Sequence, residues 1–306
     1  MCMQSPVIHI ANLSKQFGRL CAVNNLSIEI DHGEVFAFLG SNGSGKTTTF
    51  RCLLGIYTPD SGTAHIHGQP YSSALRNTVG YLPEERGIYT RARVLDTLHY
   101  FAQLHGLSRE ERTRNIDEYL ERVGLTAHGE QRIDQLSSGM QQKVQIGAAI
   151  VHEPSVLILD EPFKGLDPLN RQLFLDLFEE RRQRGATILY STHVVDEVQK
   201  LATRIVMLKN GSRVLYGSVD EIRNKYSSHT LTLTFSGTLP EHPELYQARV
   251  EHNYAELVPA EGVVPNRILR LLVDTPGLEL REFKFDRPSL NTIFIQEAQH
   301  THNHAT

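Results

Sequence analysis

The apolar positions of the first two-thirds of the chain form short continuous runs that alternate with stretches of helical spacing. The runs at Val35–Leu39, Val156–Asp160 and Ile188–Tyr190 are typical of strands buried on both faces. Helical spacing is seen from Lys46 onward and at Val94–His105, Ser108–Val123, Met140–His152 and Pro168–Arg184. Two further strands are predicted at Val7–Leu13 and Ala22–Ile30. Such alternation predicts an α/β domain of parallel strands joined by crossover helices.

The pattern changes from Thr230 onward. Thr230–Phe235 alternates apolar residues with threonine, which predicts a strand with one solvated face. The further elements that we predict are a helix at Pro265–Leu272, a strand at Leu278–Phe285 and a closing helix at Pro288–Gln296. This end of the chain is therefore expected to form a small α+β domain. The three histidines of the terminal segment His300–His304 allow weak metal binding, but a disordered, solvated end is the favoured interpretation.

Charge and proline content support a boundary between these two parts. The chain has 306 residues and a net charge of −4, and residues 226–306 hold six basic and ten acidic residues and six of the 13 prolines. At about 150 residues per domain, two domains are expected. We place them at residues 1–225 and 226–306.

Composition also excludes several classes of protein. The near-neutral charge argues against a dedicated nucleic-acid binder. No apolar run approaches the roughly 18–20 residues that span a bilayer, and no basic start followed by an apolar stretch marks a secretory signal. The widely spaced cysteines Cys2, Cys21 and Cys52 indicate free thiols in a reducing compartment. The expected location is the cytoplasm.

The segment Gly40–Thr47 fits the pattern G-x-x-x-x-G-K-[ST], between a buried strand and a helix. Its glycines let successive backbone N–H groups converge on a phosphate at a helix N-terminus. Lys46 reaches the β- and γ-phosphates, and the Thr47 hydroxyl is a ligand for Mg²⁺. The residues expected to bind the nucleotide are Gly40, Ser41, Asn42, Gly43, Ser44, Gly45, Lys46, Thr47 and Thr48. The sequence therefore predicts a P-loop NTPase.

Two carboxylates end the predicted strand Val156–Asp160. The carboxyl ends of parallel strands face the ligand crevice, so Asp160 can hold Mg²⁺ while Glu161 activates the attacking water. The alternative is that both residues cap the following helix. A third element, Leu136–Gln142, precedes another helix, where Ser137 and Gly139 either form a second anion site or a plain helix cap.

In this order, the three elements resemble those of the ATP-binding cassette (ABC) ATPases over about residues 4–225. Gly40–Thr47 corresponds to the Walker A loop of that family, Val156–Asp160 to its Walker B strand, and Leu136–Gln142 to its signature motif. Gly165–Pro168 resembles its D-loop. The resemblance alone implies that His193, in Ser-Thr-His, is the switch histidine and that Phe17 stacks on adenine.

The resemblance implies an ABC-type ATPase domain with a helical subdomain, and ATP and Mg²⁺ as cofactors. It implies a head-to-tail dimer, with a second copy or with a similar ATPase subunit, that sandwiches two ATP molecules between the Walker A loop of one subunit and the signature motif of the other. It further implies a separate integral-membrane permease, so that the chain lies peripherally on the inner face of the cell membrane, and no nucleic-acid partner. Substrate choice would lie in the permease.

One position departs from the family pattern. Tyr81–Gly87 places Glu84 where the family usually has a glutamine that contacts Mg²⁺ and the membrane partner. A carboxylate there predicts a stronger interaction with the metal, whereas the alternative is a turn residue that pairs with Arg86. The segment resembles a branch of sodium-efflux and antibiotic-export ATPases, and Pro288–Phe294 resembles the closing motif of that branch's accessory C-terminal domain.

The main hypothesis is therefore an ATP-hydrolysing subunit that energises an exporter. The first alternative is a non-transport ABC ATPase that acts on a ribosome or on nucleic acid. Its translation branch normally has two cassettes and its DNA-repair branch a long coiled-coil insertion, and this chain has neither. The second alternative is a module that binds ATP without turnover, against which Glu161 and His193 argue.

Overall fold

The computed structural model describes residues 5–85, 87–226, 231–260, 262–285, 290–291, 293–294 and 297. The chain divides into two compact units, residues 1–219 and residues 220–306. The boundary predicted between residues 225 and 226 falls at the end of helix α7 (Val219–Lys225) and stays a prediction. None of the helices that the structure describes is long and apolar enough to cross a membrane.

The central sheet of the first unit has the strand order β5-β6-β7-β3-β8-β9. Its strands are β3 (Val35–Leu39), β5 (Val79–Leu82), β6 (Val156–Asp160), β7 (Thr187–Thr192), β8 (Arg204–Lys209) and β9 (Ser212–Ser218). Neighbouring strands are parallel except for β8 and β9. All side chains of β3, β6 and β7 are buried, which confirms the predicted α/β architecture.

A second, antiparallel sheet in this unit has the strand order β2-β1-β4. Its strands are β1 (Ile8–Phe17), β2 (Leu20–Ile30) and β4 (Ser61–Ile66). It shares a hydrophobic core with the central sheet and with α1 (Lys46–Leu53). The predicted strand Val7–Leu13 was too short, because the later residues of β1 are partly or fully exposed and carry no apolar pattern, although they pair with β2.

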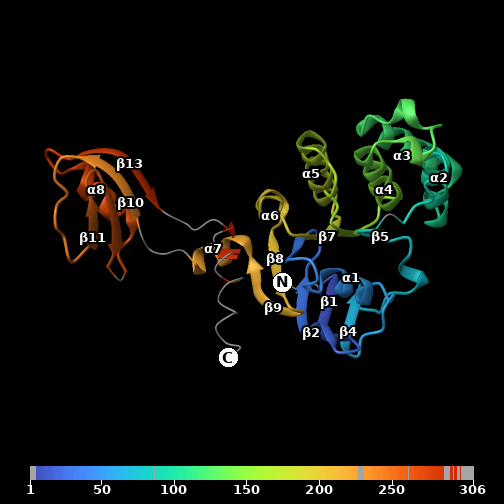
Figure 1. Ribbon diagram of the computed structural model, residues 1–306, viewed down its shortest axis with the longest axis horizontal. Helices are drawn as coiled ribbons and strands as arrows, with labels where there is room; N and C mark the ends of the chain where they lie inside the picture. Colours follow the sequence, from blue (N-terminus) through green and yellow to red (C-terminus); the bar gives the residue numbers. More distant parts are fainter. Residues whose placement is uncertain are drawn as a thin grey trace. The chain divides into compact units, whose positions relative to one another are not determined.

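Helices α2, α3 and α4 form a helical subdomain, in which α2 packs against both α3 and α4 (Figure 1). Besides α1, the α-helices described in this unit are α2 (Val94–Leu104), α3 (Arg109–Arg122), α4 (Ser138–Ile150), α5 (Pro168–Gln183) and α6 (Val195–Leu201). Short 3-10 turns lie at Ser73–Leu75, Thr126–His128 and Ile133–Gln135. The predicted helices agree with α2 to α5 within a few residues, and the predicted helical subdomain is confirmed.

The second unit is built on an antiparallel sheet with the strand order β11-β12-β10-β13. Its elements are β10 (Leu231–Ser236), β11 (Tyr246–Glu251), β12 (Tyr254–Pro259), α8 (Pro265–Val273) and β13 (Glu279–Phe285). Ile268 and Leu272 of α8 pack into the same core as Leu231 and Leu233. The α+β expectation is confirmed. The terminal histidines and part of Pro288–Phe294 lie outside the described residues, but Leu290 and Ile293 are buried.

Candidate nucleotide site

The loop between β3 and α1 is shaped by glycines that no other residue could replace without strain. A Cβ on Gly40 would lie 2.5 Å from the backbone oxygen of Leu208. Gly45 caps α1 with a φ of 106°, and its Cβ would lie 2.3 Å from the oxygen of Ala22. Both contacts are too short for a side chain, and a positive φ favours glycine. The backbone at the N-terminus of α1 is therefore open to an anion.

Lys46 lies at the start of α1 with its ammonium group held inside this loop. Its side chain is only 6% exposed, and Nζ donates to the backbone oxygens of Gly40 at 2.8 Å and Ser41 at 3.1 Å. Nζ also lies 3.8 Å from Oε1 of Glu161. Burial lowers the pKa of Lys46, and the nearby Glu161 carboxylate opposes this effect. Within the described residues, the ammonium group contacts two backbone oxygens and one carboxylate, and a positive charge in this place is suited to binding a phosphate.

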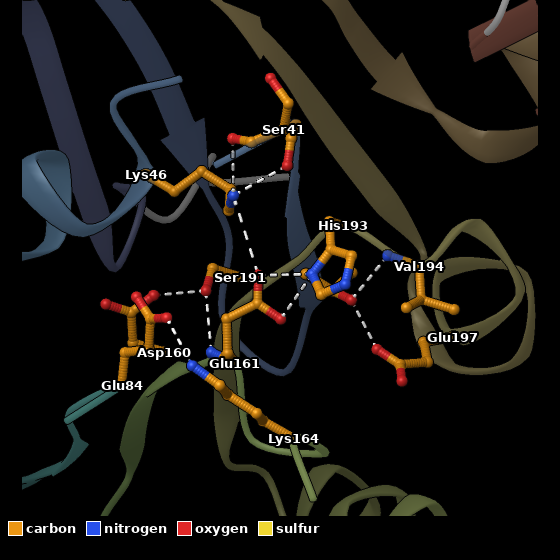
Figure 2. A network of polar contacts seen from close by, with 12 residues as sticks. Ser41, Lys46, Glu84, Asp160, Glu161, Lys164, Ser191, His193, Val194 and Glu197 are labelled. Carbon is orange, nitrogen blue, oxygen red and sulfur yellow. Dashed lines mark hydrogen bonds and ion pairs between the residues drawn. The ribbon is translucent and has the colours of Figure 1, made fainter. Parts of the chain in front are cut away.

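Asp160 ends β6, and Ser191 on the neighbouring strand β7 holds it in place. Ser191 Oγ donates to Asp160 Oδ1 and accepts the backbone N–H of Glu161 at 2.9 Å (Figure 2). Burial raises the pKa of Asp160, whereas the hydrogen bond from Ser191 opposes the rise. Among the described residues, Asp160 Oδ2 has no hydrogen-bond partner, and the same is true of Ser44 Oγ in the loop. Buried polar atoms without a partner are costly, so both are candidates to contact a ligand.

Glu161 and His193 face each other across the ends of β6 and β7. His193 Nδ1 lies 3.1 Å from each carboxylate oxygen of Glu161, and Figure 2 shows the imidazole directed at that carboxylate. Glu161 is 8% exposed and His193 is 54% exposed. Glu161 also has a φ of 49°, a conformation that costs a non-glycine residue about 1–2 kcal/mol and that is often found at functional sites.

The alternative that Asp160 and Glu161 cap the next helix is wrong. The cap of α5 is Asp167, whose side chain accepts the backbone N–H of Asn170 at 2.8 Å. Asp160 and Glu161 are instead buried near Lys46, and both contribute favourable charge interactions to it. Sequence alone could not separate these interpretations, because Asp160, Glu161 and Asp167 all precede the same helix.

Glu84 follows β5 and pairs with Lys164, three residues after Glu161. Lys164 Nζ lies 2.9 Å from Glu84 Oε1 (Figure 2), and this hydrogen bond is the main cause of the raised pKa of Lys164. Arg86, the partner that the alternative interpretation gave to Glu84, lies outside the described residues. No sequence signal pointed to Lys164, because the two side chains are 80 positions apart.

A cavity of about 320 Å³ brings most of the predicted residues together. Its lining consists of Phe17, Leu20, Ala22, Asn42, Gly43, Ser44, Gly45, Lys46, Thr47, Thr48, Glu84 and Glu161. The Phe17 ring is held edge-on by Tyr57, with the ring centroids 5.3 Å apart, and keeps 42% of its surface exposed. Leu20 and Ala22 were not predicted from the sequence, since nothing in their pattern separates them from ordinary strand residues.

Ser137 and Gly139 are not among the described residues that line this cavity. Ser137 caps α4, and its hydroxyl accepts the backbone N–H of Met140 at 3.3 Å. The helix-cap interpretation of this segment is thus confirmed, with a contribution of about 1 kcal/mol to stability. A cap of this kind leaves other N–H groups of the first turn available, so the anion-site hypothesis stays a prediction.

The comparisons with known proteins agree with this geometry. The ABC transporter family profile matches residues 23–164, and a profile for the C-terminal domain of DrrA1-3-like ATP-binding proteins matches residues 217–298. The uncharacterized ABC transporter ATP-binding protein YhaQ of Bacillus subtilis is 34% identical over 294 residues, which are 95% of this chain and 98% of YhaQ. The chain is an ABC transporter ATP-binding protein.

Two further relatives and two solved structures are also similar to this ABC ATPase. The Nod factor export ATP-binding protein I of Rhizobium sp. is 30% identical over 96% of this chain and 97% of its own length. The linearmycin resistance ATP-binding protein LnrL of Bacillus subtilis is 31% identical over 76% of each chain. A solved ATP-binding subunit of an ABC transporter superposes with a TM-score of 0.68 at 30% identity, over 72% of this chain and 93% of its own. Clostridium perfringens cbiO1, part of the transporter complex cbiONQ, superposes with a TM-score of 0.62 at 29% identity, over 72% of this chain and 94% of its own.

Membership of this family means that the chain binds ATP and that its activity is ATP hydrolysis coupled to transport. The predicted P-loop NTPase fold is confirmed by the solved ATP-binding subunits. The individual roles predicted for the site residues are proposals that the geometry above supports.

Proposed function

We propose that this ATPase energises export through a separate integral-membrane permease and lies on the cytoplasmic face of the cell membrane. The observation that carries the proposal is the similarity to the Nod factor export ATP-binding protein I, which extends over 96% of this chain and so includes both units. The match of residues 217–298 to the DrrA1-3-like C-terminal domain supports the same branch.

Affinity purification of the full chain from detergent-solubilised membranes tests this proposal. The expected result is a polytopic membrane protein that copurifies in a fixed ratio and raises the ATPase rate of the purified chain. Copurification with ribosomal proteins or nucleic acid, with no membrane protein, would favour the non-transport alternative. An ATPase rate unaffected by the copurified membrane protein would argue against energetic coupling.

We propose that the working ATPase is a head-to-tail dimer with a second copy or with a similar ATPase subunit. Support comes from the family to which the chain belongs. The phosphate-binding loop lines the cavity, whereas Ser137 and Gly139 do not, and neither do Asp160 and His193. The N-terminus of α4 would then face an ATP molecule held by the other subunit. An anion at a helix N-terminus is stabilised by the free N–H groups and by the helix dipole.

Within the cavity, Lys46 would bind the β- and γ-phosphates, and Phe17 would stack on the base with its exposed face. Thr47 and Asp160 would hold Mg²⁺, which when bound partly neutralises the negative charge of the phosphates. The residues fit that ion, because Asp160 has an oxygen without a partner among the described residues. The described part of the chain contains no group of three or more His, Cys, Asp or Glu side chains able to hold a metal, so phosphate and water oxygens would complete the ligand set.

Glu161 would accept the proton of the attacking water, and His193 would hold the Glu161 carboxylate in position. Hydrolysis needs a general base within hydrogen-bond reach of the water. The 3.1 Å contacts from His193 Nδ1 to both Glu161 oxygens restrict the rotation of that carboxylate. Loss of the γ-phosphate removes the charge that binds the two subunits together, so hydrolysis would open the dimer.

Glu84 is expected to change its partner when Mg²⁺ and ATP enter. In the structure its carboxylate pairs with Lys164, whose side chain is 61% exposed, and Glu84 also lines the cavity. A carboxylate beside a divalent cation interacts with it more strongly than an amide does. Lys164 therefore competes with the metal for Glu84. Exposed ion pairs contribute only about 0–1 kcal/mol, so this competition is weak.

Glu84→Gln is expected to raise the Mg²⁺ concentration for half-maximal binding of a fluorescent ATP analogue, and Lys164→Met to lower it. Each shift should be no more than about fivefold, given the small contribution of an exposed pair. Glu85→Gln is the matched control and should cause no shift, because the Glu85 side chain is next to Glu84 in the sequence but does not line the cavity. An unchanged Mg²⁺ dependence in Glu84→Gln would leave Glu84 as a turn or coupling residue.

Truncation after Tyr226 is expected to leave ATP binding intact. All the residues of the cavity and the core shared by the two sheets of the first unit lie before that position. Dissociation constants for the ATP analogue should agree within about twofold, and any loss should fall on dimer stability or on coupling to the permease. The disappearance of a cooperative thermal unfolding transition in the truncated chain would show that the second unit completes the fold.

A further inference from the structure

Glu197 on α6 is a buried carboxylate that has no role in the site described above. It is only 4% exposed. Its Oε2 accepts a hydrogen bond from Thr192 Oγ1 at 2.5 Å, and its Oε1 lies 3.5 Å from Nε of Arg171 on α5. Burial raises the pKa of Glu197, whereas the Thr192 hydrogen bond and the Arg171 charge oppose the rise. A buried carboxylate is costly even when paired, so its position calls for a physical reason.

The Thr192 hydroxyl makes a second hydrogen bond, which joins the residues immediately before and after His193. It donates to Glu197 and at the same time accepts the backbone N–H of Val194 at 3.0 Å. The bond from Thr192 to the N–H two residues later fixes the backbone on both sides of His193. Figure 2 shows Val194 and Glu197 on one side of the imidazole and Glu161 on the other.

His193 depends on this anchoring because its side chain is 54% exposed. An exposed side chain has few packing neighbours to select its rotamer, so its direction is set mainly by its own backbone. Tyr190 adds a further restraint, since its buried hydroxyl donates to the backbone oxygen of Glu197 at 3.2 Å. Two residues of β7, Tyr190 and Thr192, therefore each form a hydrogen bond with Glu197 near the start of α6. These bonds restrain the chain that leads to His193.

We infer that Thr192 and Glu197 are positioning residues that hold the His193 imidazole against the Glu161 carboxylate, with Arg171 as the counter-charge that keeps Glu197 in place. The inference rests on the proposed function, because it requires that the contact between His193 and Glu161 serve ATP hydrolysis. Neither residue lines the cavity, so neither is expected to touch the nucleotide.

Thr192→Val tests the inference because it keeps the shape of the side chain and removes the hydroxyl. We expect kcat for ATP to fall about tenfold or more, since small errors in the position of a catalytic group cost one to two orders of magnitude. KM and the dissociation constant of an ATP analogue should stay within about twofold. Thr192→Ser restores the hydroxyl and should restore most of kcat. Thr203→Val is the matched control, because it removes a threonine hydroxyl that donates to Val35 on the same sheet, and kcat should not change.

A double-mutant cycle with His193 separates positioning from general destabilisation. In a His193→Ala background, Thr192→Val should reduce kcat by less than about twofold, because the group that it positions is already gone. Glu197→Gln, which keeps an acceptor for Thr192, should retain more kcat than Glu197→Ala. Thermal unfolding of each variant shows whether it folds. If Thr192→Val does not fold, the difference in kcat between Glu197→Ala and Glu197→Gln provides the test.

The outcomes distinguish this inference from the proposed function. If His193→Ala itself keeps the wild-type kcat, the role proposed for His193 fails and the inference fails with it. If His193→Ala loses kcat but Thr192→Val and Glu197→Ala do not, only the inference is overturned. A full additional loss from Thr192→Val in the His193→Ala background would also overturn it, since the effect would then not act through His193.

Discussion

Glu161→Gln is expected to reduce kcat for ATP hydrolysis by about 10²- to 10⁴-fold, the usual contribution of a general base, while ATP binding persists. The amide has the size of the carboxylate but does not accept a proton from water. The buried side chain leaves little room for a replacement base, because Glu161 is 8% exposed and already contacts His193 and Lys46. Phosphate release and the dissociation constant of an ATP analogue measure the two effects separately.

The same variant should accumulate as an ATP-bound dimer, because bound ATP that is not hydrolysed keeps its γ-phosphate charge. Glu179→Gln is the control: it lies on α5, pairs with Arg182 and does not line the cavity, so its turnover should equal that of the wild type. Normal turnover in Glu161→Gln would remove Glu161 from the role of base, and the search for one would move to another group near the cavity.

Lys46→Ala is expected to weaken ATP binding by about 10- to 100-fold. Hydrogen bonds to charged groups contribute about 1.5–3 kcal/mol, and about 1.4 kcal/mol corresponds to a tenfold change in affinity. The effect should be large because Lys46 is buried and its ammonium group also lies 3.8 Å from Glu161. Without it, the carboxylates of Glu161 and Asp160 would repel the phosphates.

Lys143→Ala is a matched control for this change. Lys143 also donates to a backbone oxygen, that of Val123 at 2.8 Å, and burial also lowers its pKa. It lies on α4 and does not line the cavity. The control should therefore keep the affinity of the wild type even if it loses some stability. Equal affinities in Lys46→Ala and the wild type would show that the loop at residues 40–47 does not bind the phosphates.

The parts of the site that could be predicted from the sequence are those set by residues close to one another along the chain. Gly40, Gly45 and Lys46 follow a fully buried strand and begin a helix, so a local pattern fixes both their conformation and their place in the fold. Asp160 could likewise be placed at the ligand end of the sheet, because the four residues before it in β6 are apolar and buried. Burial on both faces leaves a clear signal in the sequence.

The parts that were not predicted include contacts between distant segments, strands with a polar face and strand β8, whose middle residues are apolar and buried. Strands β4 and β11 were missed because most of their side chains are exposed, so they carry little apolar pattern. The pair of Glu84 with Lys164 depends on how two loops are placed by parallel strands. Thr192 and Glu197, which share a hydrogen bond, are only five positions apart. The sequence does not show that the Glu197 carboxylate is buried, because its burial results from the packing of α6 against β7.

Phosphate release from Mg-ATP by the purified wild-type chain, measured over a wide range of protein concentrations, tests most directly whether two subunits complete one ATP site. If Ser137 and Gly139 at the N-terminus of α4 complete the ATP site of the other subunit, as proposed, a single copy should be a poor ATPase. We expect the turnover per chain to rise with protein concentration and to approach a plateau as dimers form. Turnover per chain that stays high and constant down to the lowest concentration would contradict this, because it would show that one copy hydrolyses ATP alone.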